Sequence, residues 1–374
     1  MLPLVALLAW PAGAAGHAVL THSTPHRGQT VEQPPPAVQF DFNEPVEVSF
    51  GAVRVYDEDG ERVDDGDITR PDESSNKVAV ALRDGLGDGV YTGTYRVVSA
   101  DGHPVSGGFS FGVGEALPTG GSAPSVADLL EESDAGPEVE GTYGVVRGFH
   151  YAALLLLIGA FAFSARAWPR RLGIAAAGAG LVAAILGIGL QGALGAGVGL
   201  GDVLDRTTID GSLDTRTGEA WAIRAAAWLI VLILLATAPR RPQRWLIALA
   251  GAVLMVVVVS LPLAGHADTQ SPKGVLVPTD LIHVLAAGVW LGGLVALLAV
   301  HWPRPDARAS ADGVAATGAF SRVALPAMLV LVAAGILQGW IYLGSLTEIF
   351  SGTYGIALFS KLALVAVIAA LATR

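Results

Sequence analysis

Three residues in the first third of the chain could bind one metal ion together: His17, Asp101 and His103. Only Gly102 separates Asp101 from His103, and alternate residues of an extended segment lie on the same face. If a signal peptide is removed after Gly16, His17 becomes the first residue and offers both its α-amine and its imidazole to one metal ion. A donor set that is rich in nitrogen and has one carboxylate favours Cu(II) over Zn²⁺ or Cu(I).

The Asp101–Gly102–His103 motif by itself is more typical of an ordinary tight turn. A metal site therefore requires that the fold bring His17 to this turn. Two further histidines, His22 and His26, lie close to His17 in the sequence. We expect them to be solvated strand or turn residues, with an auxiliary copper-binding role as the alternative.

The first sixteen residues, MLPLVALLAWPAGAAG, are an apolar run followed by small residues. This pattern predicts a signal peptide over residues 1–16 that is cleaved after Gly16, although no Lys or Arg precedes the apolar run. The alternative is an uncleaved membrane anchor, for which the run is short.

Short runs of strand-forming residues, separated by Gly, Pro and Asp, occupy residues 17–114. They predict an all-β antiparallel sandwich, and these strands would have to position the three candidate ligands. The runs are 37–42, 50–57, 77–82, 89–98 and 107–113. Residues 115–142 are rich in Gly, Ser, Pro and acids and predict a flexible tether, in which VADLLEESD could form one or two helical turns.

Residues 143–374 predict an all-α bundle of about seven transmembrane helices. The apolar stretches are 145–168, 172–193, 220–238, 245–263, 277–300, 323–343 and 356–373. Arginines gather in alternate connecting segments, which predicts that these segments and the carboxyl terminus are cytoplasmic and that the β-domain is outside. The arginines are Arg166, Arg170, Arg171, Arg240, Arg241, Arg244, Arg304, Arg308 and Arg374.

Composition excludes several classes of function. The formal net charge of −10 argues against a nucleic-acid partner and suits a surface that attracts cations. Because the chain has no cysteine, it can form no disulfide and no thiolate metal site. No phosphate-binding loop of the G-x-x-x-x-G-K type is present, so ATP-driven transport is not expected.

The segments HAVLTHSTPHRGQTVEQPPPAVQFDFNEPVE and YRVVSADGHPVSGGFSFGV resemble the opening and the closing hairpin of the CopC copper-resistance domain. The resemblance covers most of residues 19–113. It implies an Ig-like or cupredoxin-like sandwich and a Cu(II) site formed by His17, Asp101 and His103. Glu44 is then implied nearby, as a hydrogen-bonding residue or a weak ligand.

The segments TDLIHVLAAGVWLGGLVALL and GTYGIALFSKLALV resemble the CopD membrane domain, which often follows CopC in one chain. That family usually has a further span after the segment that ends here at Arg374, so we expect a domain of seven helices or a shortened one. In WLGGL, Gly292 and Gly293 are expected to permit close packing of helices.

Polar side chains within the predicted spans lie toward the outer side of the membrane. Four of them, His150, His266, Asp280 and His283, form a candidate membrane metal site, because such residues usually face a bundle interior or a watery cavity. Asp280 and His283 are one helical turn apart and share a face. The alternative is structural: Asp280 and His283 would form a hydrogen-bonded pair, and other polar residues such as Arg224 would neutralise buried acids.

These patterns predict a copper-homeostasis protein of the plasma membrane and not an enzyme. The outer domain would bind Cu(II) and pass it to a membrane domain that mediates uptake, with the copper ion, the lipid bilayer and extracytoplasmic copper carriers as partners. One alternative is a membrane cupric reductase, in which His150 and His283 would ligate a haem. Another is an adhesion or partner-binding β-domain on a membrane anchor.

Overall fold

The structure is a computed structural model of the 374-residue chain. It describes residues 18–48, 52–99, 104–115, 125–131, 135–163, 170–239, 243–301, 311–343, 359–360 and 363. The chain forms two compact units. The β-unit consists of His17–Tyr143 and Gly187–Glu219, and the helical unit consists mainly of Gly144–Leu186 and Ala220–Arg374.

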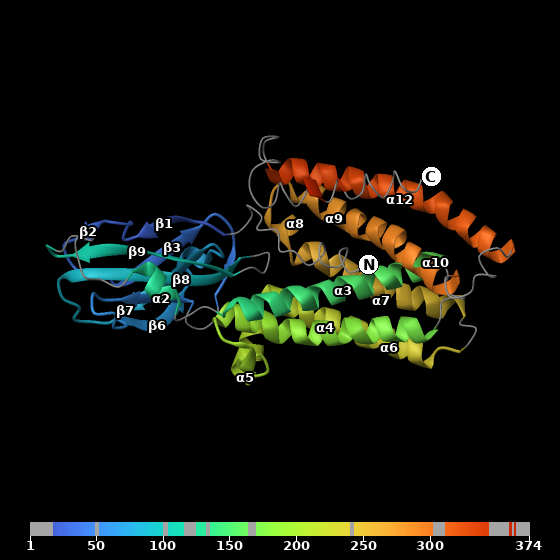
Figure 1. The fold of residues 1–374 in the computed structure, drawn as a ribbon. Coiled ribbons are helices and arrows are strands. Elements are labelled where there is room, and N and C mark those ends of the chain that lie inside the picture. Colours follow the sequence, from blue (N-terminus) through green and yellow to red (C-terminus); the bar gives the residue numbers. More distant parts are fainter. Residues whose placement is uncertain are drawn as a thin grey trace. The chain divides into compact units, whose positions relative to one another are not determined.

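Two sheets make up most of the β-unit (Figure 1). One sheet contains, in spatial order, β1 (Leu20–Thr24), β3 (Ala37–Phe42), β7 (Lys77–Leu82) and β6 (Asp64–Thr69). The other contains β2 (Thr30–Val31), β9 (Pro104–Val113), β8 (Gly89–Ser99) and β4 (Val46–Glu47), and β5 (Val53–Tyr56) also pairs with β8. Among the described strand pairs, β2–β9 is parallel and the others are antiparallel.

The core of the β-unit lies between these sheets. Along β3, alternate residues are buried, because successive side chains of a strand point to opposite faces. Phe40 from this strand lies 5.4 Å from Phe109 of β9, measured between ring centroids. The predicted sandwich is therefore confirmed, and its inner faces carry the apolar residues that the sequence pattern indicated.

The predicted tether contains ordered structure. Helix α2 (Val126–Glu131) packs against β8 and β9, so the expected helical turn is confirmed. The side chain of Val126 lies so close to Gly108 that a Cβ at this glycine would be 3.0 Å from it. Helix α3 (Pro137–Phe163) begins before the predicted end of the tether. Flexibility of the remaining tether residues stays a prediction.

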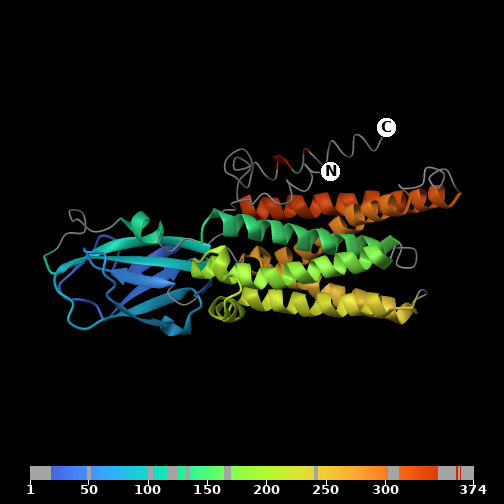
Figure 2. The same cartoon turned by 60° about the horizontal axis from the view of Figure 1, so that its bottom comes forward.

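Six helices of the described residues are long and apolar enough to span a membrane (Figures 1 and 2). They are α3, α4 (Arg170–Ala196), α6 (Arg216–Thr237), α7 (Arg244–Leu263), α9 (Lys273–Ala287) with its continuation, and α12 (Ala311–Leu343). Helix α9 continues through the π-helical η3 (Gly288–Gly292) into α10 (Gly293–His301). The seventh predicted span, 356–373, lies almost entirely outside the described residues.

Short elements connect the longer ones. They are η1 (Pro71–Glu73), η2 (Leu200–Asp202), α5 (Arg206–Leu213) and α8 (His266–Thr269). Within the helical unit, α12 packs along α9 (Figure 1). Helix α3 approaches η3 so closely that a Cβ at Gly159 or Gly292 would overlap backbone atoms of the other segment. The expected packing role of the glycines in WLGGL is therefore confirmed.

Candidate functional site

The chain segment that leads to His17 is fixed against the turn after β3. His17 itself lies outside the described residues. The backbone N–H of Val19 donates to Asn43 Oδ1 at 2.7 Å, and the Asn43 N–H donates to the carbonyl oxygen of Val19 at 3.1 Å. Ala18 is buried in the sandwich core.

The segment that leads to Asp101 and His103 is fixed beside the same turn. The Ser99 hydroxyl donates a hydrogen bond to the carboxylate of Glu44, the residue after Asn43, and both side chains are buried. Ser99 is the last residue of β8 and lies opposite Val46 of β4. Asp101 and His103 lie outside the described residues, in the connection between β8 and β9.

These contacts join two regions that are far apart in the sequence. Asn43 holds the segment before β1, and Glu44 holds the end of β8. The described residues thus bring the approaches to all three predicted ligands to one end of the sandwich. Glu44 adds a buried negative charge, which attracts a cation more strongly than a solvated one.

His22 and His26 have a different environment. Both are exposed, and their rings are in edge contact with centroids 4.5 Å apart. This arrangement agrees with the expectation of solvated histidines and makes them suitable controls for copper-binding experiments.

Two charged side chains of the sheets bind helix ends within the β-unit. Arg96 of β8 donates from Nε and Nη2 to the carbonyl oxygen of Leu194 near the end of α4, at 3.2 and 2.9 Å. Glu47 of β4 accepts a 2.5 Å hydrogen bond from the backbone N–H of Arg216, the first residue of α6. A cation at a helix carboxyl end and an anion at an amino end both complement the helix dipole.

Glu47 gives this contact a pH dependence. Burial raises the pKa of its carboxyl group, while hydrogen bonds from the Arg216 and Thr217 backbone lower it; the net change is upward. The folded state therefore binds this proton more tightly than the unfolded state does, so the contribution of Glu47 to stability falls as the pH rises through the raised pKa.

We expect Glu47→Gln to stabilise the protein more at pH 7.5 than at pH 5, relative to the wild type. The Gln side chain keeps an oxygen that accepts the hydrogen bond from the Arg216 N–H. Unlike the Glu47 carboxyl group, it does not ionise between pH 5 and pH 7.5. Thermal unfolding at the two pH values measures the difference, with Glu58→Gln, an exposed acid, as the control. An equal shift at both pH values would contradict the assignment.

His150 is part of a buried polar group that links three helices. Its Nε2 accepts a hydrogen bond from Trp228 Nε1 on α6 at 3.5 Å, and its ring stands at 82° to that of Trp221, 5.0 Å away. The guanidinium of Arg224 lies 4.8 Å from the Trp221 ring and donates to Ser260 on α7. Arg224 thus adds a positive charge to the buried group that contains His150. This charge disfavours the binding of a second cation by the imidazole of His150.

Asp280 and His283 face α12. Gln338 Nε2 donates to Asp280 Oδ1 at 3.1 Å, and the ring of His283 lies next to Gly335, one turn earlier on α12. Both residues are partly buried, and Gln338 is buried. The predicted shared face of Asp280 and His283 is therefore present.

The three predicted membrane ligands whose side chains are described, His150, Asp280 and His283, do not gather as a group. Among the described residues, no three His, Asp or Glu side chains could hold a metal ion together. His150 is turned toward α6, whereas Asp280 and His283 are turned toward α12. His266 begins α8, and its side chain lies outside the described part of the chain.

Comparisons with known proteins identify the parts of the chain. A CopC domain matches residues 20–114, the N-terminal domain of copper resistance protein D-like proteins matches 138–275, and copper resistance protein D matches 314–374. The chain is 30% identical over 378 residues to the copper transport protein CutJ of Bacillus subtilis (strain 168), covering 96% of this chain and 67% of CutJ. The chain belongs to the CopC–CopD family.

Other similar proteins cover single parts. Copper resistance protein D of Pseudomonas syringae pv. tomato is 28% identical over 166 residues, which are 42% of this chain and 53% of that protein. The crystal structure of CopC from Methylosinus trichosporium OB3b is 25% identical and covers 26% of this chain and 93% of its own, with a TM-score of 0.24.

In this CopC–CopD chain, the rotation of α3 bears on the alternative of a haem site. Gly159, which contacts η3, is nine residues after His150, and nine residues are two and a half helical turns. His150 therefore lies on a different side of α3 from Gly159, and its ring contacts Trp221 and Trp228 of α6. A bis-histidine haem needs two imidazoles that face one another, so these contacts do not favour the pairing of His150 with His283, which stays a prediction.

Several contact residues of this CopC–CopD chain were missed by the sequence reasoning. In the β-unit they are Asn43 and Ser99, which hold the approaches to the predicted site. In the helical unit they are Trp221 and Trp228, whose spacing of seven residues places both on one helix face and could have indicated their shared neighbour.

Proposed function

We propose that this chain binds Cu(II) outside the membrane with the carboxylate of Asp101, the imidazoles of His17 and His103, and the α-amine of a processed His17. The observation that carries the proposal is the convergence at Asn43 and Glu44, where the approaches to these ligands are fixed side by side. Glu44 is proposed to support the site through its buried charge. The copper ion is cargo, and extracytoplasmic copper carriers are its proposed source.

Copper-related relatives support this proposal. CutJ is named a copper transport protein, and the Pseudomonas protein is named for copper resistance. The multi-pass helical region supports a role in the membrane, because a single span would suffice for an anchor. We propose that the helical unit mediates copper uptake and that the chain catalyses no reaction.

The orientation follows from the arginine pattern. Described arginines stand at the starts of α4 and α7, as Arg171 and Arg244, and the positive-inside rule then makes these helix ends cytoplasmic. The β-unit is consequently proposed to be extracytoplasmic and the carboxyl terminus to be cytoplasmic, in the plasma membrane.

Within the helical unit, Asp280 and His283 are proposed to receive the ion. They lie one turn apart and present a carboxylate and an imidazole to the interface between α9 and α12. These are suitable ligands for copper. His266 is proposed to contribute from α8, whereas the tryptophan and arginine contacts of His150 favour a structural role for that residue.

Replacing His283 by Ala should abolish copper uptake. Proteoliposomes that contain the full chain and a copper-sensitive dye would report the rate of entry, with the exposed His26→Ala as the control. We expect the wild type and His26→Ala to take up copper at equal rates and His283→Ala to match empty liposomes. Uptake by His283→Ala at the wild-type rate would contradict the assignment.

A further inference from the structure

Two exposed leucines lie in the segment that joins α4 to α6. Leu204 is 73% exposed and Leu200 is 44% exposed. The turn η2 begins at Leu200, and Val203 continues it with helical dihedral angles, so the two leucines lie four residues apart on one side of the turn. The Asp205 N–H donates to the carbonyl oxygen of Asp202 at 3.0 Å and fixes the turn behind them. The depth of this segment in the membrane decides which phase surrounds the pair.

The segment is packed against the last turns of α4. A Cβ at Gly189 would overlap the carbonyl oxygen of Val203, and a Cβ at Gly192 would overlap that of Thr208. Because the two glycines have no side chain, the backbone of the segment lies directly on the helix. Leu204 follows Val203 in the chain, and consecutive Cα atoms are about 3.8 Å apart. Leu204 is therefore held close to the level of Gly189.

The level of Gly189 is inside the apolar part of α4, which is one of the six candidate membrane spans. About 20 residues of helix cross the hydrocarbon layer of a bilayer. Counted from Leu172, the first residue after the paired arginines, they end at Gln191. Gly189 is two residues before that end, about 3 Å along the helix axis. Leu204 thus lies where the acyl chains meet the headgroups.

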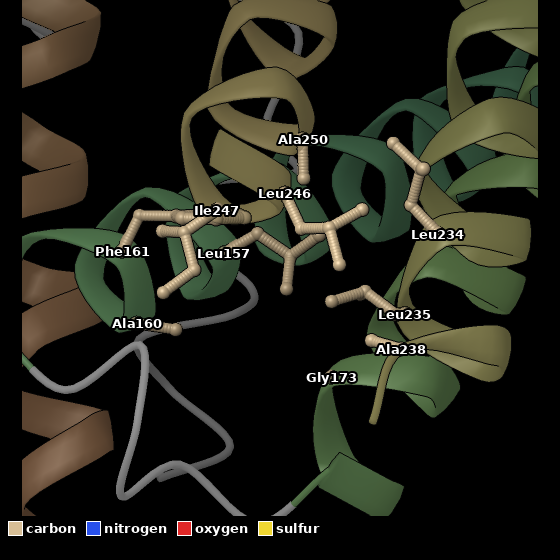
Figure 3. Close-up of a pocket in the computed structure, with 10 residues that line it drawn as sticks. All are labelled: Leu157, Ala160, Phe161, Gly173, Leu234, Leu235, Ala238, Leu246, Ile247 and Ala250. Carbon is tan, nitrogen blue, oxygen red and sulfur yellow. The ribbon is translucent and has the colours of Figure 1, made fainter. Parts of the chain in front are cut away.

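Apolar side chains that lie between the helices are covered by the chain itself. In the helical unit, side chains of α3, α6 and α7 point toward one another around a cavity of about 70 Å³, to which Gly173 of α4 adds no side chain (Figure 3). Such packing removes side chains from lipid as well as from water. Leu200 and Leu204 remain exposed, and at their depth the surrounding apolar phase is lipid.

We propose that the segment between α4 and α6 is an interfacial membrane anchor, whose Leu200 and Leu204 insert among the acyl chains at the edge of the bilayer. Apolar faces of interfacial helices are buried about 5–10 Å into this boundary. Residues 200–216 contain four aspartates and two arginines, so a zwitterionic lipid surface suits the segment better than an anionic one. The anchor requires no copper and is independent of the proposed function.

Spin labelling of the full chain in phosphatidylcholine liposomes tests this proposal. Because the chain has no cysteine, Leu204→Cys provides a single site for a nitroxide label. Power saturation measures collisions of the label with oxygen, which concentrates in hydrocarbon, and with a nickel chelate, which stays in water. Two reference variants are Ile230→Cys, at a position of α6 that is 45% exposed within a span, and Asp84→Cys, at an exposed position of the β-unit.

We expect the ratio of oxygen to nickel collisions at Leu204 to exceed the ratio at Asp84 several-fold and to approach that at Ile230. Leu200→Cys should give the same result, so the test does not depend on one labelled variant. A ratio at both leucines equal to that at Asp84 would place them in water. Low collision rates with both reagents would mean that protein covers them. Either result would overturn the proposal, and neither would affect the copper site.

Discussion

Replacing His17 by Ala should weaken Cu(II) binding by the processed chain at least about a hundredfold. Loss of residues that merely support metal ligands already costs about 10- to 100-fold in affinity, and His17 is proposed to supply a ligand directly. Competition titration with a Cu(II) chelator measures the dissociation constants. The affinity of the wild type should also fall on acidification, because protons compete for the imidazoles and the α-amine.

The matched control is His26→Ala, which removes an exposed histidine that lies close to His17 in the sequence. It should bind Cu(II) as the wild type does. If His17→Ala also keeps the wild-type affinity, His17 is not a ligand and the proposed site is wrong. Loss of affinity in His26→Ala instead would assign the copper to the exposed pair formed with His22.

Replacing Gly292 by Ala should destabilise the helical unit by about 1–3 kcal/mol, the usual cost of forcing an extra group into a closely packed contact. A Cβ at this position would overlap the carbonyl oxygen of Leu155 on α3, and the reciprocal position, Gly159, faces the Gly292 backbone. Both neighbours are backbone atoms, which cannot move aside as a side chain would. Helix α3 and η3 would have to separate.

Thermal unfolding in detergent micelles, followed by circular dichroism, measures this effect. Gly178→Ala on α4 is the control, because a Cβ there would meet no atom within 4 Å. Removing a helical glycine in open space should be neutral or slightly stabilising, since Ala has the higher helix propensity. Equal thermal midpoints for Gly292→Ala and the wild type would show that the two segments are not in close contact.

The strands that the sequence predicted accurately are those with strong alternation. β3 and β7 have the bounds that were predicted, and β8 and β9 form the predicted hairpin. The missed strands include β6, whose sequence DDGDIT resembles a turn. Its Asp64 is fully buried because it accepts hydrogen bonds from the Val55 N–H and from Arg62. β6 also pairs with β7, where Asp64 lies opposite Leu82, and pairing between separate segments is invisible to a local pattern.

The membrane spans were predicted from hydropathy, which locates apolar segments and is insensitive to helix ends outside them. Helix α3 begins at Pro137 and carries Glu138 and Glu140 in its first turn, before the apolar run starts. Helix α12 likewise begins at Ala311, well before the predicted start at residue 323. Charged first turns extend a helix without changing the length of the apolar part.

Rotation of the helices about their own axes was beyond the sequence reasoning. The sequence gives the spacing of Asp280 and His283, and the structure confirms that they share a face. It does not reveal which neighbour a face meets. His150 was grouped with them by depth, but its face meets Trp221 and Trp228 on α6. Which residues form a site together depends on the contacts between different helices.

Electron paramagnetic resonance of the full, processed chain with one equivalent of Cu(II) tests the central claim most directly. The account predicts a single axial Cu(II) species with hyperfine coupling to nitrogen, whose spectrum is unchanged in His26→Ala and altered in His103→Ala. A wild-type spectrum in His103→Ala, or the spectrum of unbound Cu(II) in the wild type, would contradict it.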